Sequence, residues 1–218
     1  NNIMSKKIAI IGHGHIGKPL LRGFLHAGVA PASMRISTDY VHNRELALFA
    51  DYIFIAVRPA VVPEVLAQIK DLLVGKLVIS TASVSKGTPV RIMPNLAIAH
   101  GQSVIGFYAD KTVKKVDRDN LKKLLSGLGL VIECKRESEL DALTLMSGAG
   151  VAMAAYLMQM LAAYGVKRGF GDKLSQQIAT KVFTGAITCL TKDKITFAKF
   201  IEAVATKGGT TEAIIAGL

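Results

Sequence analysis

The sequence predicts an α/β protein in which a parallel sheet covered by helices precedes an all-helical region. Up to about residue 133, short runs of β-branched and aliphatic residues alternate with helical stretches, the pattern of a doubly wound sheet. From about Ser138 onward no strand-like run occurs, and the chain reads as consecutive helices. We therefore expect two domains: residues 1–136 form the sheet domain and residues 137–218 the helical domain.

The strands of the first domain are predicted from continuous apolar runs. Such runs are typical of parallel strands, because helices cover both faces of a parallel sheet and leave neither face to water. The predicted strands are residues 7–12, 34–38, 52–57, 76–81, 90–95 and 130–134. Between them, residues 18–28 and 63–73 read as crossover helices, the first ended by Gly28 and the second begun by Pro63.

The helical domain is predicted to hold four or five helices separated by glycine-containing turns. They are residues 138–146, 148–168, 172–191 and 196–205, with a last helix that runs to Leu218. The stretch 148–166 approaches the length of a membrane span, but it contains Gln159, two tyrosines and many alanines. Because no second span accompanies it, we interpret it as a helix buried on all sides in a dimer.

The composition indicates a globular chain with a positive field. Net charge is +11 and the isoelectric point about 9.7, yet the basic residues are scattered, and only 111–123 is dense in them. That segment reads as an amphipathic helix with a solvated face, so we expect an anionic small ligand and no nucleic-acid partner. Cys134 and Cys189 are far apart, which fits a reducing compartment. No signal peptide precedes Met4, and we expect a cytoplasmic protein outside the membrane.

Residues 12–17, Gly-His-Gly-His-Ile-Gly, fit the G-x-G-x-x-G pattern of a Rossmann-like dinucleotide-binding domain. A predicted strand leads into this segment and a predicted helix leaves it, as the pattern requires. Gly12 would permit the tight turn, Gly14 the approach of a pyrophosphate to the backbone, and Gly17 close packing. The alternatives are a turn that merely needs glycines and a metal held by the two histidines. No Cys/His/Asp cluster elsewhere has ligand spacing, so we expect no metal.

The end of the second predicted strand is where this fold distinguishes NAD from NADP. An acidic residue there favours the ribose 2′-hydroxyl of NAD, whereas small hydroxyls and a cation favour the 2′-phosphate of NADP. Asp39 supports NAD. Ser37, Thr38 and Arg44 support NADP. The residues by themselves leave both cofactors open.

A second glycine-rich turn lies near the end of the chain, where Gly208-Gly209-Thr210-Thr211 leads into the last helix. Such a turn presents backbone N–H groups and hydroxyls, which suit a carboxylate. It is also the ordinary composition of an interhelical turn capped by threonine. The dinucleotide loop in the same chain favours the binding role. The Ser-Gly-Ala-Gly of 147–150 could equally be a helix start with close packing.

Taken in order, these motifs resemble the pyrroline-5-carboxylate reductase family, whose members catalyse the last step of proline synthesis. "IGHGHIGKPLLRGFLHAG" is similar to the family's Ile-Gly-x-Gly-Asn-Met-x-x-x-(Leu/Ile)-x-x-Gly. "ADYIFIAVRP", "KLVIST", "VRIMPN" and the helix from Leu140, similar to Asp-Ala-(Val/Leu)-Thr-x-Leu-Ser-Gly-Ser-Gly-Pro-Ala-Tyr, follow in family order. The most specific piece is "VATKGGTT" at 204–211, similar to Val-Thr-Ser-Pro-Gly-Gly-Thr-Thr. The resemblance covers essentially the whole chain.

The resemblance implies an NAD(P)H-dependent oxidoreductase, with NADP expected and NAD as the alternative. Hydride would pass to the C=N bond of a cyclic imine, converting 1-pyrroline-5-carboxylate to L-proline in a homodimer or higher homo-oligomer. A protonated iminium already attracts hydride, so the protein's task is to position the reactants. That agrees with the absence of a Ser/His/Asp set or a carboxylate pair in the sequence.

The resemblance also assigns residues to the two ligands. The cofactor would meet Gly12, Gly14, His15, Ile16 and Gly17 at the pyrophosphate, Ser37, Thr38 and Asn43 at the adenosine ribose, and Ala56, Val57, Arg58, Pro59, Ala82, Ser83, Met93, Pro94 and Asn95 at the following strand ends. The substrate would meet Thr206, Gly208, Gly209, Thr210 and Thr211, supplied by the second copy in the dimer. Thr206 and Thr211 are the catalytic candidates, near the ring nitrogen.

Departures from the family pattern leave other functions open. The segment 38–52 is too short for a full helix and strand, and the segment 80–90 lacks the family's helix, so the cofactor domain is trimmed. Lys207 replaces a proline of the substrate turn, and Ala205 replaces a threonine. The alternatives are a reductase of another imine and a non-catalytic, nucleotide-binding paralogue. Hydroxy-acid reductases of this scaffold place a lysine in the long central helix, and 145–165 has none.

Overall fold

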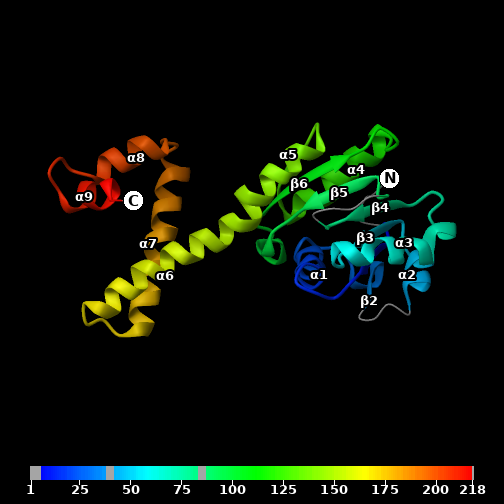
Figure 1. Cartoon of the computed structure of the whole chain (residues 1–218), viewed down its shortest axis with the longest axis horizontal. Helices are drawn as coiled ribbons and strands as arrows, with labels where there is room; N and C mark the ends of the chain where they lie inside the picture. The colour runs from blue at the N-terminus through cyan, green and yellow to red at the C-terminus, as the bar shows by residue number, and fades with distance from the viewer. Residues whose placement is uncertain (1–5, 38–41, 83–86, 218) are drawn as a thin grey trace. The chain divides into compact units, whose positions relative to one another are not determined.

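The structure is a computed structural model that describes residues 6–37, 42–82 and 87–217 (Figure 1). The chain divides into two compact units, Asn1–Ala152 and Met153–Leu218. The first holds a mostly parallel sheet with flanking helices and the second is helical, which confirms the predicted fold class. The domain boundary predicted after residue 136 follows the last strand and stays a prediction. The compact units divide later, because the helix that follows still packs on the sheet.

A seven-stranded sheet with the order β2-β1-β3-β4-β5-β6-β7 organises the first unit. Its strands are β1 (Ile8–Ile11), β2 (Met34–Ser37), β3 (Tyr52–Ile55), β4 (Leu77–Ser80), β5 (Val90–Met93), β6 (Ser103–Ala109) and β7 (Gly129–Glu133). Every neighbouring pair is parallel except β5 and β6. In the parallel register Ile11 lies beside Ser37 and Ile55, so the carboxyl ends of these strands are level with one another.

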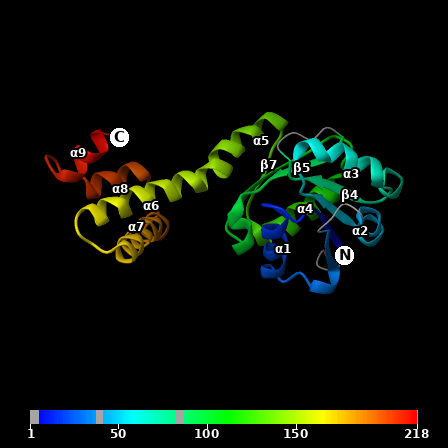
Figure 2. The same cartoon turned by 60° about the horizontal axis from the view of Figure 1, so that its bottom comes forward.

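Helices cover both faces of the sheet. In the first unit they are α1 (Gly17–His26), α2 (Asn43–Phe49), α3 (Val62–Ile69), α4 (Lys115–Leu125) and α5 (Glu137–Leu143), with short 3₁₀ turns η2 (Pro31–Ser33), η3 (Pro59–Val61), η4 (Lys70–Leu72), η5 (Leu96–His100) and η6 (Ser126–Leu128). Helices α1 and α4 lie on one face of the sheet, and α2 and α3 lie on the other (Figure 2). Side chains of α1 and α4 pack into one core, and side chains of α2 and α3 pack into a second core. Alternate residues of β1, β3 and β4 belong to the two cores, which explains the continuous apolar runs of these strands.

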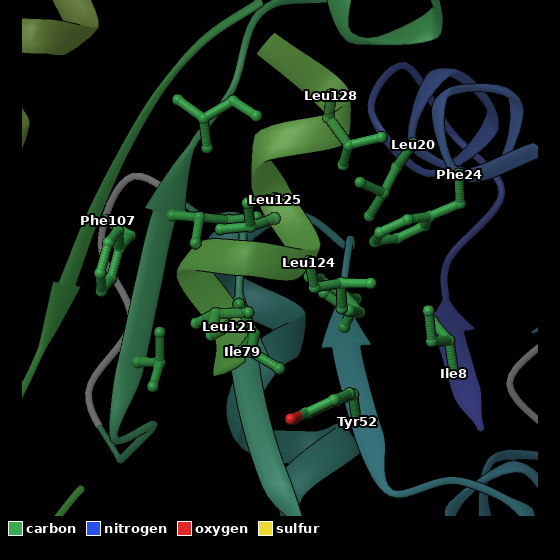
Figure 3. Packing of buried hydrophobic residues seen from close by; sticks show 14 of the residues in the cluster. Ile8, Leu20, Phe24, Tyr52, Ile79, Phe107, Leu121, Leu124, Leu125 and Leu128 are labelled. Carbon is green, nitrogen blue, oxygen red and sulfur yellow. The ribbon is translucent and has the colours of Figure 1, made fainter. Parts of the chain in front are cut away.

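The larger core lies between the sheet and the helices α1 and α4 (Figure 3). Phe24 of α1 and Phe54 of β3 meet edge to face with ring centroids 5.3 Å apart, and both are fully buried. Leu121, Leu124 and Leu125 project from α4 toward the strands. Fully burying one such side chain stabilises the fold by roughly 1.5–3 kcal/mol, so this layer fixes the position of α1.

Two elements of the first unit were not expected from the sequence. β6 runs antiparallel to β5 and contains Gly106, where a Cβ would lie 2.6 Å from Cδ1 of Leu143. The packing of α5 on β6 therefore requires a glycine at this position. In the sequence, the same glycine breaks the pattern typical of a strand. The seven-residue helix α2 lies within the segment 38–52, whose length predicts no full helix and strand. In residues 42–51 of that segment the structure has no strand.

The remaining helices follow the predicted spans closely. The π-helix η7 (Thr144–Ala149) joins α5 to α6 (Gly150–Lys167) in one run, and α7 (Asp172–Lys192), α8 (Phe197–Val204) and α9 (Thr210–Ala216) complete the second unit. The sequence predicted a break between helices near residue 147, and the structure has the π-turn there instead. Within the described residues, the run Glu137–Lys167 is long and apolar enough to cross a membrane by length and composition alone.

Candidate active site

The carboxyl ends of the parallel strands bring most of the predicted cofactor residues to one edge of the sheet. β1, β3, β4 and β5 point the same way, and Gly12, Ala56, Ala82 and Pro94 follow them. Val57, Arg58 and Pro59 continue from β3.

Ligands of open α/β sheets bind at this edge, where loops from several strands meet. The arrangement supports a single elongated site along the ends of β1, β3, β4 and β5.

The loop between β1 and α1 contains two glycines that have no room for a side chain. Gly12 has a φ of +112°, and a Cβ there would lie 2.4 Å from the carbonyl oxygen of Ala56. A Cβ on Gly17 would lie 1.9 Å from the carbonyl oxygen of Gly12. Because both contacts are with backbone, no side-chain rotation relieves them. The loop therefore folds tightly against the end of β3, where the N–H of Ala56 donates to the carbonyl of Ile11 at 2.8 Å.

Gly14 is the opposite case, since a Cβ built there meets no atom within 4 Å. It lies exposed beside the first turn of α1, a ten-residue helix with no acidic residue in that turn. Ile16, the N-cap, has a side chain that makes no capping hydrogen bond. Because no side chain caps this helix start, an anion would meet the positive end of the helix dipole there. Two glycines are needed for folding, and the third leaves space that a phosphate group would fill.

The two histidines of this loop, His13 and His15, are both exposed. Their ring N–H groups are suitable donors for phosphate oxygens. In the described ranges 6–37, 42–82 and 87–217, no three His, Cys, Asp or Glu side chains come together as a metal site would require. The assignment of His15 to the cofactor stays a prediction.

The two described residues at the predicted ribose end of the site, Ser37 and Asn43, are both buried. Ser37 closes β2 and is buried. Asn43 is fully buried, and its Nδ2 donates to Oε1 of Gln68 at 2.8 Å, whereas its Oδ1 has no hydrogen-bond partner in the described part of the chain. Thr38 and Asp39 lie outside the described residues. The amide of Asn43 therefore links α2 to α3, and its role at the ribose stays a prediction.

Arg44, which the sequence offered as a partner for a 2′-phosphate, is paired within the protein. Its Nη1 and Nη2 donate to the two carboxylate oxygens of Asp71 at 2.7 Å each. Nη1 also donates to the carbonyl of Gln68 at 2.8 Å. The hydrogen bonds from Arg44 hold the pKa of Asp71 at about 2, below its usual 3.8. A bidentate pair of this kind fixes the guanidinium, so a 2′-phosphate would have to compete with Asp71.

The ends of β4 and β5 are buried. Ala82 donates its N–H to Oγ of Ser80 at 3.1 Å, and Ser83 lies outside the described residues. Met93 and Asn95 are 8% and 6% exposed. The side-chain amide of Asn95 is used within the protein, because Nδ2 donates to Oγ of Ser147 at 2.9 Å and Oδ1 accepts from the N–H of Ala97 at 3.0 Å.

The predicted substrate turn belongs to the second unit. Gly208 has a φ of +75°, and the N–H of Gly209 closes the turn on the carbonyl of Thr206 at 2.9 Å. A Cβ on Gly209 would lie 2.6 Å from Oγ1 of Thr206, so the two residues are packed together. The N–H of Gly208 donates to Oε2 of Glu212 at 2.6 Å. One N–H of the turn thus already holds a carboxylate, which is the chemistry expected of it.

The sequence did not predict three polar contacts of the first unit, two ion pairs and one hydrogen bond. Arg91 is buried in β5 and pairs with Glu137 and, at 3.7 Å, with Asp141 of α5. A charged residue inside the apolar run "VRIM" is the signal that could have revealed it, since buried charges need partners. The bond between Asn95 and Ser147 had no such signal, because the residues lie 52 positions apart. The fold alone brings them together.

Comparison with protein families finds two matches along the chain. A family described as pyrroline-5-carboxylate reductase dimerisation matches residues 137–218. A family described as NADP oxidoreductase, coenzyme F420-dependent, matches residues 7–84. The first match covers the helical region and the second covers the strands and helices around the glycine loop.

Curated relatives match nearly the whole chain. The pyrroline-5-carboxylate reductase of Synechocystis is 30% identical over 85% of this chain and 72% of that protein. The enzyme of the same name from Corynebacterium melassecola is 29% identical over 95% of this chain and 88% of that protein.

Among solved structures, Plasmodium falciparum pyrroline carboxylate reductase with NADP bound has a TM-score of 0.86 at 23% identity, covering 99% of this chain and 90% of that one. The reductase from Coxiella burnetii has a TM-score of 0.82 at 24% identity, covering 97% and 89%. At these identities the structures demonstrate a shared fold, and it extends over the sheet and the helices.

Proposed function

The chain belongs to the pyrroline-5-carboxylate reductase family, and we propose on that basis that it reduces 1-pyrroline-5-carboxylate to L-proline with a nicotinamide cofactor. The observation that carries the proposal is the glycine loop at the carboxyl edge of the sheet. There Gly12 and Gly17 admit no side chain, while Gly14 borders open space.

The residues of this chain fit a dinucleotide. The backbone around Gly14 and the uncapped first turn of α1 would hold the pyrophosphate, with His15 as an additional donor. The ends of β3, β4 and β5 would hold the half of the molecule that carries the nicotinamide. The cofactor is NADP, with NAD as the alternative, and when bound it supplies the hydride for reduction of the imine.

The turn from Thr206 to Thr211 would hold the substrate. Its backbone N–H groups and hydroxyls suit the carboxylate of the cyclic imine, and Thr206 or Thr211 would hydrogen-bond the ring nitrogen. The carbon of the C=N bond receives the hydride, and the nitrogen carries the proton of the iminium form. The chain has therefore only to hold the two molecules in the geometry that hydride transfer requires.

The helical region would also join two copies of the chain. It matches the dimerisation region of the family, and the chain forms a homo-oligomer. We assign the homo-oligomer as a dimer or a multiple of dimers, located in the cytoplasm. The exposed apolar side chains of α6 and α7 support that assignment.

The direct test is turnover of 1-pyrroline-5-carboxylate by the purified full chain with NADPH and, separately, NADH. We expect proline to form in step with cofactor oxidation and to be abolished in Gly14→Val. Other cyclic imines serve as competing substrates, because faster turnover of one of them would reassign the substrate. If the parent binds cofactor but reduces no cyclic imine, the chain is a nucleotide-binding paralogue and the proposal fails.

A further inference from the structure

Asn95, two residues after the end of β5, is at the centre of a buried set of hydrogen bonds, which we call the relay. Its backbone N–H donates to Oγ of Ser103 at 3.0 Å, and its Nδ2 donates to Oγ of Ser147 at 2.9 Å. Its Oδ1 accepts from the N–H of Ala97 at 3.0 Å. Every polar group of the side chain therefore has a partner inside the protein. An amide engaged at both its nitrogen and its oxygen determines where its own backbone lies.

The partner residue Ser147 lies within the π-helix η7. Its hydroxyl accepts from Asn95 and donates to the carbonyl of Val104 on β6 at 3.1 Å, and it is only 6% exposed. π-Helical turns are rare, insert one extra residue into a helix and occur frequently at functional sites. Here the extra residue places Ser147 on the sheet side of the helix.

The helix before the π-turn packs directly on the sheet. A Cβ on Gly106 would lie 2.6 Å from Cδ1 of Leu143 and 2.8 Å from Cδ1 of Leu140, so α5 rests directly on the backbone of β6. Arg91 adds its ion pair to Glu137 from the neighbouring strand. With α5 fixed in this way, the π-turn determines where Ser147 meets Asn95.

On its other side the relay reaches the helix of the glycine loop. Asn95 caps the 3₁₀ turn η5, and the carbonyl oxygen of Ile98 in that turn lies against α1. A Cβ on Gly23 of α1 would be only 2.3 Å from that oxygen. η5 and α1 are therefore in backbone contact, and a displacement of Asn95 would be transmitted to η5 and α1.

We propose that Ser147 and Asn95 form a positioning pair for hydride transfer. They fix the peptide after β5, where the nicotinamide half of the cofactor is expected, relative to the glycine loop that holds the pyrophosphate. Neither residue touches the reacting atoms. The inference rests on the proposed function and deepens it, because a displacement of about 1 Å at the reacting centre costs as much as a hundredfold in rate.

The test compares Ser147→Ala with Ser126→Ala in the full chain. Ser126 is the matched control, because its hydroxyl also donates to a backbone carbonyl, that of Lys123 at 2.8 Å, but on the exposed end of α4. In Ser147→Ala we expect kcat to fall about tenfold while the dissociation constant of NADPH changes less than about threefold. The primary isotope effect with 4-deuterated NADPH should rise, because the hydride step becomes slower. In Ser126→Ala all three quantities should equal those of the parent.

Hydrogen exchange of the protein without cofactor gives a second readout. In Ser147→Ala the amides of Ala97 and Ile98 should exchange at least about fivefold faster than in the parent, because Asn95 loses a partner. If the alanine variant unfolds, Ser147→Cys replaces it, because cysteine has a similar shape but is a weaker hydrogen-bond donor and acceptor. It should show the same changes in kcat and exchange with smaller magnitude. The double variant Ser147→Ala with Asn95→Ala should be no slower in turnover than the slower single variant.

A lower melting temperature with unchanged kcat and isotope effect would show a merely structural bond and overturn the proposal. Unchanged exchange at Ala97 and Ile98 would overturn the relay itself. An inactive parent would instead refute the proposed function, and the exchange experiment would still decide whether the relay exists.

Discussion

The two units of the chain differ in where they place their apolar side chains. In the first unit Phe24, Phe54 and Phe107 are completely buried between the sheet and its helices. In the second unit Tyr156 of α6 and Ile187 of α7 are 62% and 60% exposed. Among its described hydrophobic residues, only two alanines are buried. The first unit therefore completes its core within one chain, and the second does not.

This difference indicates what the second unit requires. Soluble monomers rarely expose a continuous apolar surface of more than a few hundred Å², and larger ones mark interfaces. The same apolar run, Glu137–Lys167, passes a length and composition test for a membrane helix. The match of 137–218 to a dimerisation family favours an interface between copies. Each unit should therefore respond differently to substitution and to dilution.

The largest effect is expected from Gly17→Ala, which tests whether the first unit depends on its glycine loop. The new Cβ would lie 1.9 Å from a backbone oxygen of Gly12, so the loop cannot keep its conformation. We expect a loss of more than about 3 kcal/mol of unfolding free energy, measured by urea denaturation. Gly14→Ala is the control, because its Cβ meets nothing within 4 Å and should leave stability unchanged. Equal stability of the two variants would refute the packing described for Gly17.

Gly14→Val separates binding from folding in the same loop. Its Cβ would meet no atom within 4 Å, so the side chain would project into the open space beside α1. We expect the dissociation constant of NADPH, measured by fluorescence titration, to rise at least about a hundredfold, a loss of about 2.7 kcal/mol. The melting temperature should stay near that of the parent. An unchanged dissociation constant of NADPH in the folded variant would contradict the assignment of the pyrophosphate to this loop.

Thr211→Ala examines the second unit. A carboxylate held by a hydroxyl loses a charge-assisted hydrogen bond worth roughly 1.5–3 kcal/mol. Steady-state kinetics should therefore show kcat/KM lowered about ten- to a hundredfold, with the cofactor dissociation constant unchanged. Thr191→Ala is the control, because that hydroxyl bonds its own helix at the carbonyl of Ile187. Weakened cofactor binding with normal substrate kinetics would mean that the two sites were assigned the wrong way round.

The smallest effect concerns the surface pair of Arg44 and Asp71. Hydrogen bonds from Arg44 lower the pKa of Asp71 to about 2 in the folded chain, against 3.8 ordinarily. A lowered folded pKa means that the pair contributes stability above about pH 4 and that this contribution is lost as the pH falls toward 2. Urea unfolding of Asp71→Asn should therefore depend less steeply on pH between 4 and 2 than unfolding of the parent. Identical slopes would show that the pair contributes nothing measurable, as many exposed pairs do.

Local patterns predicted the parts of the fold that depend on neighbouring residues. The strand, glycine loop and helix around Gly12 follow one another directly in the sequence, and so does the turn before Thr210. β6 was missed because Gly106 interrupts its pattern, and the reason for that glycine lies on α5, far along the chain. Helix α2 was missed because a segment of seven residues is too short for helical periodicity to register.

The parts of the site that could not be predicted depend on long-range contacts. Asn43 was expected at the ribose from its place in a motif, yet its amide bonds Gln68 of another helix. Arg44 was offered as a phosphate partner, and Asp71 already holds it. Asn95 was assigned to the cofactor, and its amide is used by Ser147 and Ala97. In each case the residue's place at the cofactor stays a prediction, and its hydrogen-bond partner became known only from the fold.

Sedimentation equilibrium of the full chain over a wide concentration range tests most directly the claim that the second unit needs another copy. The exposed apolar side chains of α6 and α7 should hold two or more chains together, so the measured mass should be at least twice 23.2 kDa at high concentration. It should fall toward 23.2 kDa on dilution, and the melting temperature should fall with it. A mass of 23.2 kDa at every concentration, with a constant melting temperature, would contradict the account.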